Sequence, residues 1–316
     1  MTFEFRRVVV DIPNPDAGEQ PTMAAAMEIA RDSEVRLCLF HSVYHRDLKQ
    51  QPGHDDAVID EARELLLDSR RAKLQDLAKC ARTSEIEVSI ELAWSKDPFL
   101  ELVRVATEEA ADLVISSTQP HTRWERLRLS NQNWQLIRFC PCSLLLAKPG
   151  QRKRYARALA AIDPLHADDK PASLDHRILE AAKSMCAMYG AELEVINVVM
   201  PVLSAAPMVA EPLLVTDTIA QEAVTEAHQK RAKELAARHA LNEADINVMV
   251  GEPADQIVEF AAGHACDLLV MGAVARSALG RLLIGNTAER VLDAIASDIL
   301  IIKPDGVKTD PQSNSA

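Results

Sequence analysis

A glycine-punctuated loop near the C-terminus carries the residue types that could hold a phosphate. An apolar run leads into Gly272-Ala-Val-Ala275, and nine residues later the chain reads Gly285-Asn286-Thr287. Glycine lets the backbone approach an anion closely, and the free N–H groups at the start of a following helix attract it. A structural role fits the same spacing, because Asn286 followed three residues on by Glu289 resembles a helix capping box. The loop therefore leaves two interpretations open.

The composition excludes several classes of partner. The chain has 316 residues, a formal net charge of −12 and a pI near 5.3. Binding to phosphate backbones needs a basic footprint, so this balance predicts no nucleic-acid partner and no anionic membrane surface. No apolar run reaches the roughly 18 residues that span a bilayer, and the N-terminal MTFEFRRVVVDIP lacks the pattern of a signal peptide. We therefore expect a cytoplasmic protein.

The cysteines and histidines show no motif of a metal centre. The chain has six cysteines and nine histidines. Cys140-Pro-Cys142 has the wrong spacing for a CxxC redox pair, and no second cysteine pair completes a zinc site. His41, His45 and His54 gather in one stretch without a ligand motif. The sequence thus predicts reduced structural thiols and no metal site.

The chain is written twice. Residues 112–149 align without a gap on residues 267–304, at a constant offset of 155. Both stretches begin with Asp-Leu and a short apolar run, and both end in an apolar run that leads into Lys-Pro. The repeat predicts two domains, at residues 1–150 and 151–306, followed by a disordered polar tail at 307–316.

Each half alternates strand-like and helix-like segments in the same order. FRRVVVDIP and RALAAIDP are short apolar strands that end in Asp-containing turns, at Asp11 and Asp163. The whole of each half reads β-α-β-α-β-α-β-α-β, which predicts an α/β fold with a doubly wound parallel sheet. Ligands of such sheets bind beyond the carboxyl ends of the strands. In the second half this points to Asp163 and to the loop that begins at Gly272.

These residues resemble the universal stress protein family, and the duplicated chain is similar to its tandem-domain branch, the universal stress protein E type. The family pattern is a strand, Gly-x-x-Gly, nine residues, Gly-[Ser/Thr], a helix and a final strand ending in Lys-Pro. The stretches DPLHADDKP at 163–171 and GNTAE at 285–289 strengthen the match, which covers nearly all of residues 3–305. The resemblance implies two tandem five-stranded sheets of strand order 3-2-1-4-5, adenine nucleotide alpha hydrolase-like, related by a pseudo-two-fold axis.

The same resemblance implies a set of ligand-binding residues. In nucleotide-binding members of the family, the Asp that ends the first strand contacts ribose and a residue at the end of the second strand backs the adenine. The glycine loop and the residues after it hold the phosphates. The corresponding residues in the second half are Asp163, Val198, Gly272, Ala275, Gly285, Asn286 and Thr287. Ala275 and Asn286 depart from the family's glycine and Ser/Thr, which predicts a weakened site.

The aligned loop of the first half departs much further. It reads SSTQPHTRWERLRLSNQNW, in which Ser117 and Pro120 replace the two glycines and Ser130-Asn131 replaces Gly-Ser. Pro120 has no N–H to offer to an anion. Trp124 and Trp134 either pack against helices or line an apolar pocket that holds no nucleotide. The first half is therefore expected not to bind nucleotide.

Three functions remain open at this point. One is a stress-response module, non-catalytic or nearly so, whose second half binds ATP weakly together with Mg²⁺ or Mn²⁺. Another is a scaffold or carrier for an apolar small molecule or a protein partner, with no nucleotide role. The third is a slow ATPase, although no residue of the loops is an obvious general base. No catalytic residue is assigned.

The sequence of the final strand in each half predicts how the two halves shield their apolar sheet edges. Leu144–Ala147 and Ile299–Ile302 are continuously apolar, and the strand order 3-2-1-4-5 makes each a sheet edge. An uncovered apolar edge is an aggregation hazard. We therefore expect the two edges to cover each other in an internal pseudo-dimer.

Overall fold

The computed structural model describes residues 4–31, 34–48, 56–82, 86–117, 132–148, 150, 154–165, 173–202, 212–272, 274–276 and 282–304. Two compact units make up the chain. The N-terminal unit consists mainly of Phe5–Lys153 and the C-terminal unit mainly of Arg154–Val307. The predicted tail at 307–316 and most of the first half's aligned loop, with Pro120, Trp124 and Ser130-Asn131, lie outside the described residues.

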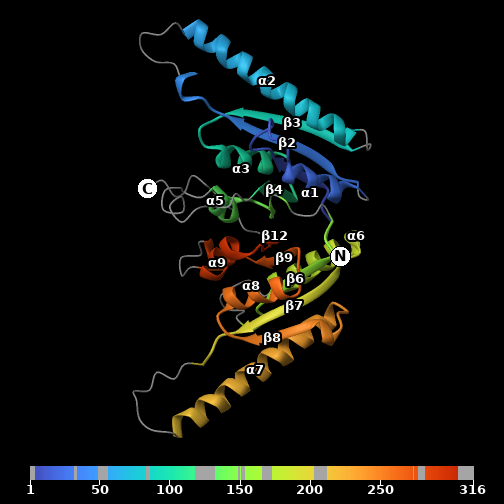
Figure 1. Ribbon diagram of the computed structural model, residues 1–316, viewed down its shortest axis with the longest axis vertical. Coiled ribbons are helices and arrows are strands. Elements are labelled where there is room, and N and C mark those ends of the chain that lie inside the picture. The colour runs from blue at the N-terminus through green and yellow to red at the C-terminus, as the bar shows by residue number, and fades with distance from the viewer. Residues whose placement is uncertain are drawn as a thin grey trace. The chain divides into compact units, whose positions relative to one another are not determined.

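The N-terminal unit is built on a parallel sheet (Figure 1). In chain order its elements are β1 (Arg7–Asp11), α1 (Pro21–Ala30), β2 (Arg36–Val43), a 3₁₀ turn (Arg46–Leu48), α2 (Asp56–Arg82), β3 (Glu87–Trp94), α3 (Pro98–Glu108), β4 (Leu113–Ser117), α5 (Gln132–Phe139) and β5 (Ser143–Ala147). The strands pair in the order β3-β2-β1-β4-β5, and each adjacent pair is parallel. This is the predicted order.

The C-terminal unit repeats this plan. Its elements are β6 (Arg157–Ile162), α6 (Leu174–Tyr189), β7 (Glu192–Val199), α7 (Pro212–Arg238), a 3₁₀ turn (Glu243–Asp245), β8 (Ile246–Val250), α8 (Pro253–Gly263), β9 (Leu268–Gly272), β10 (Val274–Arg276), β11 (Leu282–Ile284), α9 (Asn286–Ala294) and β12 (Asp298–Ile302). The order β8-β7-β6-β9-β12 again corresponds to 3-2-1-4-5, with parallel pairs throughout. The two tandem α/β domains predicted from the sequence are confirmed.

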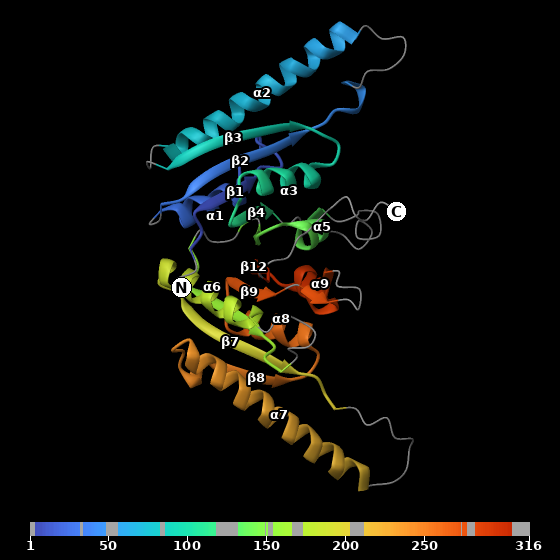
Figure 2. The same cartoon turned by 180° about the vertical axis from the view of Figure 1, so that it is seen from behind.

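Helices cover both faces of each sheet. Right-handed crossovers place the first two helices of a unit on one face and the last two on the other. In the C-terminal unit, Figure 1 shows α8 and α9 on the near side, and Figure 2 shows α6 from behind. In the N-terminal unit, Phe99 of α3 packs against Phe139 of α5 with ring centroids 6.4 Å apart. Because the helices cover the two faces, the loops that follow the strands gather at the carboxyl ends of the strands, which we call the carboxyl edge of the sheet.

A short hairpin is added to the predicted pattern. β10 and β11 pair antiparallel, with Ala275 opposite Leu283. These two strands lie between β9 and α9 in the chain, where the sequence indicated only a loop. Ala275 lies in extended backbone, so alanine at the place of the family's second glycine causes no strain there. This removes one of the two reasons for expecting a weakened site.

One carboxylate in each unit fastens the fourth strand to the first. Asp112 accepts a hydrogen bond from the amide of Arg7 at 2.9 Å, and Asp267 accepts one from the amide of Arg157 at 3.0 Å. Arg7 and Arg157 are therefore equivalent, at an offset of 150. The fourth strands remain offset by 155, as the gap-free alignment predicts.

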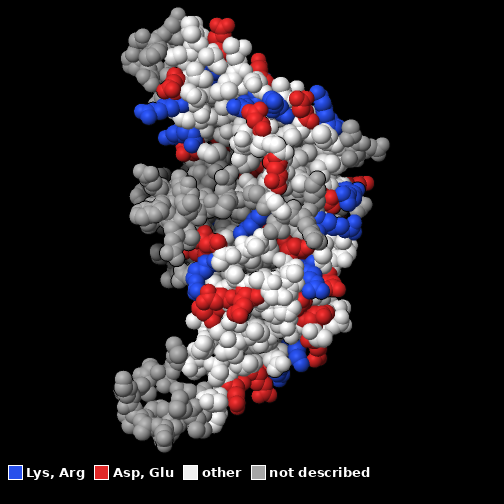
Figure 3. Space-filling view, in the orientation of Figure 1, with Lys and Arg blue, Asp and Glu red and all other residues white. Residues whose placement is uncertain are grey.

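Acidic and basic side chains are interspersed over the face that Figure 3 shows. Many form ion pairs within one helix or between neighbouring helices. Arg104 lies 2.9 Å from Glu101 on α3, and Arg290 of α9 lies 2.6 Å from Glu252, which precedes α8. These basic side chains are thus balanced by an acidic neighbour.

Candidate functional site

Three of the predicted site residues share the carboxyl edge of the C-terminal sheet. Asp163 directly follows β6, Val198 is the penultimate residue of β7, and Gly272 ends β9. The strand register makes them neighbours, because Ile162 pairs with Asn197 and Ala161 pairs with Met271. The parallel sheet therefore gathers at one edge residues that lie up to 109 positions apart (272 − 163).

The start of α9 lies after the hairpin on the same side of the fold. Gly285 is the N-cap residue, with φ −74° and ψ 146°, and its carbonyl oxygen accepts the amide of Glu289 at 3.2 Å. Asn286 is thus the first helical residue and not the cap. The cap therefore lies one residue before the Asn286 of the capping-box interpretation. The helix instead presents the amides of its first turn, with Thr287 half-buried beside them.

The two glycines of the loop have different structural reasons. A Cβ atom at Gly272 would lie 2.8 Å from Cδ2 of Leu174 and 3.3 Å from its Cγ, so this glycine allows α6 to pack on β9. Among the described residues, a Cβ atom at Gly285 would meet nothing within 4 Å, and its φ is one that any residue adopts. Packing therefore explains Gly272, while open space adjoins Gly285 at the start of α9.

A buried polar chain fixes the backbone just before Asp163. Asn197 of β7 donates its side-chain amide to the carbonyl oxygen of Ile162 at 3.0 Å, and its own oxygen lies 2.8 Å from Nδ1 of His228 on α7. Asn197 is fully buried and His228 is 4% exposed. The amide of Asp163 donates to the buried carboxylate of Asp175 at 3.2 Å. The position of Asp163 is therefore set by β7, α6 and α7 together.

Sequence reasoning missed this polar chain. Its signal is a single asparagine inside the apolar run VINVV of β7. The partners His228 and Asp175 lie on helices, 31 and 22 residues away from Asn197 (228 − 197 and 197 − 175). Only the fold brings them together.

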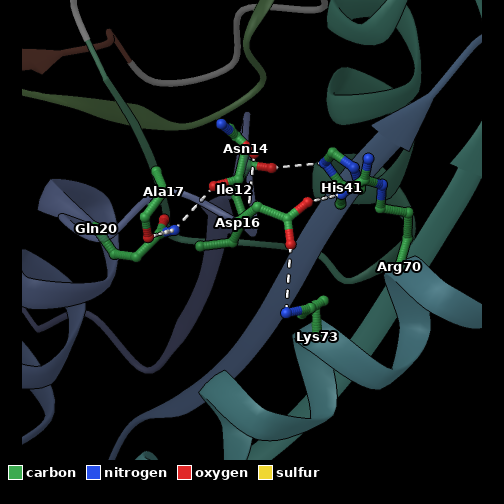
Figure 4. A network of polar contacts seen from close by, with 8 residues as sticks. All are labelled: Ile12, Asn14, Asp16, Ala17, Gln20, His41, Arg70 and Lys73. Atoms are coloured by element: carbon green, nitrogen blue, oxygen red, sulfur yellow. Dashed lines mark hydrogen bonds and ion pairs between the residues drawn. The ribbon is translucent and has the colours of Figure 1, made fainter.

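The corresponding edge of the N-terminal unit makes the same backbone contact with a different residue. Nδ1 of His41, near the end of β2, lies 2.7 Å from the carbonyl oxygen of Ile12, as Figure 4 shows. Burial lowers the pKa of His41, and the hydrogen bond to Ile12 opposes this in part. A neutral imidazole whose Nδ1 carries the proton therefore donates to that carbonyl.

An ion-pair cluster closes the loop after β1 onto α2. Asp16 of the loop pairs with Arg70, and its carboxylate lies 3.4 Å from Nζ of Lys73 (Figure 4). The hydrogen bond from Arg70 is the main cause that holds the pKa of Asp16 below its ordinary value. Gln20 further fixes the loop by donating to the carbonyl oxygens of Asn14 and Ala17. The N-terminal unit thus uses this loop for contacts of its own.

Asp11 and Asp163, which the sequence presents as parallel strand-ending residues, are not equivalent. The offset of 150 between the first strands places Ala161 at the position of Asp11 and Pro13 at the position of Asp163. The edge of the N-terminal sheet therefore lacks a carboxylate where the C-terminal unit has Asp163.

Asp11 has a structural role inside the N-terminal unit. It is 6% exposed, and its carboxylate accepts a hydrogen bond from Oγ of Ser116 on the neighbouring strand at 2.8 Å. Burial raises the pKa of Asp11 from 3.8 to about 6, and the bond from Ser116 opposes that rise. Ser117, which follows Ser116 in the chain, ends β4 at the position where Gly272 ends β9. The polar residues at this end of β1 and β4 thus contact each other.

Two further properties concern the described residues as a whole. Within the ranges given above, no three His, Cys, Asp or Glu side chains gather in a way that could hold a metal ion. In that part of the chain, no helix is both long and apolar enough to cross a membrane.

Comparisons with known proteins extend over both units. The model of the Universal stress protein family matches residues 4–148 and again residues 155–303. Universal stress protein E of Escherichia coli (strain K12) is 23% identical over 311 residues, which cover 97% of this chain and 96% of that protein. The functionally unknown protein PA1789 from Pseudomonas aeruginosa PAO1 aligns with a TM-score of 0.72 and 25% identity, over 95% of this chain and 93% of that one. A putative universal stress protein from Pseudomonas aeruginosa UCBPP-PA14 aligns with a TM-score of 0.71 and 25% identity, over 95% and 94%.

Proposed function

Because the chain belongs to the universal stress protein family, we propose that it is a stress-response module whose C-terminal unit binds an adenine nucleotide. The ligand lies at the carboxyl edge of β6, β7 and β9, against the start of α9. The observation that carries this proposal is Gly285, whose missing side chain is required neither by its backbone nor by any packed neighbour among the described residues. A ligand beside α9 would explain the glycine, because the ligand would occupy the space that a side chain would otherwise fill.

Several of the candidate residues have roles that fit their places at the edge. The carboxylate of Asp163 accepts hydrogen bonds from ribose hydroxyls, and charge-assisted bonds of this kind are strong. Val198 presents an apolar side chain to the adenine. The amides at the start of α9 and the positive end of its dipole stabilise phosphate oxygens, with Mg²⁺ or Mn²⁺ accompanying ATP. Asn286 and Thr287 stand in the first turn, where the family has Ser/Thr.

The N-terminal unit is not the nucleotide-binding half. Pro13 replaces the edge carboxylate, and the loop that follows it is tied to α2 by Asp16, Arg70 and Lys73. A nucleotide at that edge would have to displace these ion pairs. We therefore propose one bound nucleotide per chain.

An aromatic cluster favours a second ligand class for the N-terminal unit. Tyr44 follows β2 and is 41% exposed, Trp94 ends β3, and their ring centroids are 5.9 Å apart. The guanidinium of Arg63 lies 5.0 Å from the centre of the Trp94 ring. Tyr44 is exposed and Trp94 is half-buried, and aromatic faces of this kind stack on planar or apolar groups. This alternative is a carrier role with no nucleotide.

Calorimetric titration of the full chain with ATP and Mg²⁺ tests the proposal. Gly285→Leu places a side chain beside α9 and is expected to lower the affinity at least tenfold without unfolding the protein. Gly263→Leu is the matched control, because a Cβ atom at Gly263 would also have no described residue within 4 Å, but Gly263 lies at the end of α8. Equal affinities for parent, Gly285→Leu and Gly263→Leu would show that Gly285 adjoins no ligand. Release of phosphate during the titration would instead indicate the slow ATPase.

A further inference from the structure

A turn in the N-terminal unit holds two thiols in contact. α5 ends at Phe139, the amide of Cys140 donates to the carbonyl oxygen of Leu136 at 2.8 Å, and β5 begins at Ser143. Within this turn the sulfur atoms of Cys140 and Cys142 are 3.8 Å apart. Spacing alone predicted purely structural thiols, because the pair lacks the CxxC pattern. The turn nevertheless aims both sulfurs at each other.

The equivalent turn of the C-terminal unit shows that the fold does not require sulfur here. The amide of Ile295 donates to the carbonyl oxygen of Val291 at 2.9 Å, as Cys140 does in its own unit. At the offset of 155, Ile295 takes the place of Cys140 and Ser297 takes the place of Cys142. One apolar residue and one small polar residue therefore suffice for this backbone. Two cysteines are an addition to what the fold needs.

Three other cysteines are kept unreactive by burial. Burial raises the pKa of Cys38 and of Cys266 to about 11 and the pKa of Cys186 to about 12. The thiolate is the reacting form of cysteine, so these groups stay protonated and inert at neutral pH. Cys80 is exposed on α2 and provides a reference for a single accessible thiol.

The two thiols of the turn differ in access. Cys142 is half-buried, whereas Cys140 is 1% exposed. A small oxidant therefore reaches Cys142 first, and the sulfur of Cys140 waits 3.8 Å behind it. A disulfide needs the sulfurs about 2 Å apart, so side-chain rotation with a slight shift of the turn closes the remaining gap.

We propose that Cys140 and Cys142 form a reversible dithiol switch that hydrogen peroxide oxidises to a disulfide within the turn. The thiolate of Cys142 attacks one oxygen of the peroxide, the O–O bond breaks, and water leaves once the departing oxygen is protonated. Cys142 is then a sulfenic acid. The sulfur of Cys140 attacks the sulfur of Cys142, the S–O bond breaks, and a second water leaves with the proton of Cys140. Two thiols lose two electrons, and one peroxide becomes two waters.

The spacing of the pair makes the product labile. Only Pro141 separates the two cysteines, so the ring that the disulfide closes is small and its geometry departs from the relaxed one. Strained disulfides are reduced easily and behave as regulatory bonds. An external dithiol therefore returns the turn to its reduced form with two thiols.

Peroxide treatment of the full chain followed by tryptic mass spectrometry tests the proposal. Both cysteines lie in one peptide, because no lysine or arginine separates them and Lys148 is followed by proline. We expect this peptide to lose two hydrogens at peroxide levels that leave Cys80 unmodified, and dithiothreitol to restore it. Oxidation of Cys80 before the pair, or stepwise oxidation of Cys142 to sulfinic acid in the parent, would overturn the proposal.

Two variants assign the roles of the sulfurs. Cys142→Ser introduces the residue type that Ser297 has at this position of the C-terminal unit. It should abolish the loss of two hydrogens and leave Cys140 unmodified. Cys140→Ala should leave the sulfenic acid of Cys142 unresolved, so that dimedone traps it at that residue. Cys80→Ser is the control and should oxidise as the parent does. If Cys140→Ala fails to fold, Cys142→Ser alone decides, since persistence of the oxidised peptide in that variant would exclude the pair.

Discussion

Asn197 donates its side-chain amide to the carbonyl oxygen of Ile162 at 3.0 Å, and both groups lie under the edge where Asp163 leaves the sheet. The same asparagine bonds to His228, so one buried side chain joins β6, β7 and α7. A buried polar group that loses its partner costs more than the bond contributed. The arrangement therefore ties the stability of the C-terminal unit to the geometry of its candidate site.

Asn197→Ala should destabilise the C-terminal unit by about 3 kcal/mol, because it leaves the Ile162 carbonyl and His228 without this partner. Urea unfolding followed by circular dichroism measures the change. Asn247→Ala is the matched control on the neighbouring strand β8, where the side chain is half-buried and its contacts are 3.4–3.5 Å long. We expect less than about 1 kcal/mol there. Equal losses in both variants would contradict the prediction.

Asp11 should make the N-terminal unit less stable as the pH rises. Its pKa is about 6 in the folded protein and 3.8 ordinarily, so between these values the folded state binds a proton that the unfolded state has lost. Stability gained from this proton is present below pH 4 and is lost as the pH passes through about 6. Asp11→Asn should remove about 3 kcal/mol of this pH dependence between pH 4 and pH 8.

Chemical unfolding of parent and Asp11→Asn at a series of pH values checks that sign. Ser116→Ala supplies a second comparison, because it removes the hydrogen bond that lowers the pKa of Asp11 and should steepen the dependence. A parent and an Asp11→Asn variant with the same pH profile would show that Asp11 titrates normally.

Asp163→Ala should weaken ATP binding by about 10- to 100-fold, since a charge-assisted hydrogen bond contributes about 1.5–3 kcal/mol. Asp16→Ala removes a loop carboxylate from the N-terminal unit and is expected to leave affinity and a stoichiometry of one per chain unchanged. Isothermal titration measures both quantities. Binding that responds to Asp16 rather than to Asp163 would place the nucleotide in the N-terminal unit. A stoichiometry of two nucleotides per chain would contradict the proposal that only the C-terminal unit binds.

Gly272→Ala should destabilise the C-terminal unit by about 1–3 kcal/mol through overpacking against α6. The new Cβ atom would lie 2.8 Å from Cδ2 of Leu174, so Leu174→Ala should relieve the clash. A double-mutant cycle measured by thermal unfolding checks this coupling. If the two substitutions add without interaction, Gly272 is not needed for the contact with Leu174.

Much of the fold could be predicted from the sequence because its repeat is local and dense in signals. The stretches at 112–149 and 267–304 align without a gap, and each carries a strand, a loop, a helix and a strand in order. Alternation of this kind leaves few topologies for a parallel sheet. The strand order of each unit follows from that pattern together with the family resemblance.

The candidate site was harder to predict, because residues of the same type have different structural roles in it. Gly272 and Gly285 look alike in the sequence, but Leu174, 98 residues before Gly272 (272 − 174), explains the first through packing. Asp11 bonds to Ser116 across 105 residues, and no local pattern marks such a pair. A single polar residue inside an apolar strand is the available signal for such partners.

The hydrogen bond at the end of the first strand has a consequence for aligning distant relatives. His41 in one unit lies 2.7 Å from the carbonyl oxygen of Ile12, just after β1, and Asn197 in the other lies 3.0 Å from that of Ile162, the last residue of β6. A comparison by residue letters scores this position as a mismatch between histidine and asparagine. A comparison of the hydrogen bonds that the side chains donate treats the position as equivalent, because each residue offers one N–H at the same point. At this position, matching the two units by the donated hydrogen bond finds an equivalence that matching by residue type misses.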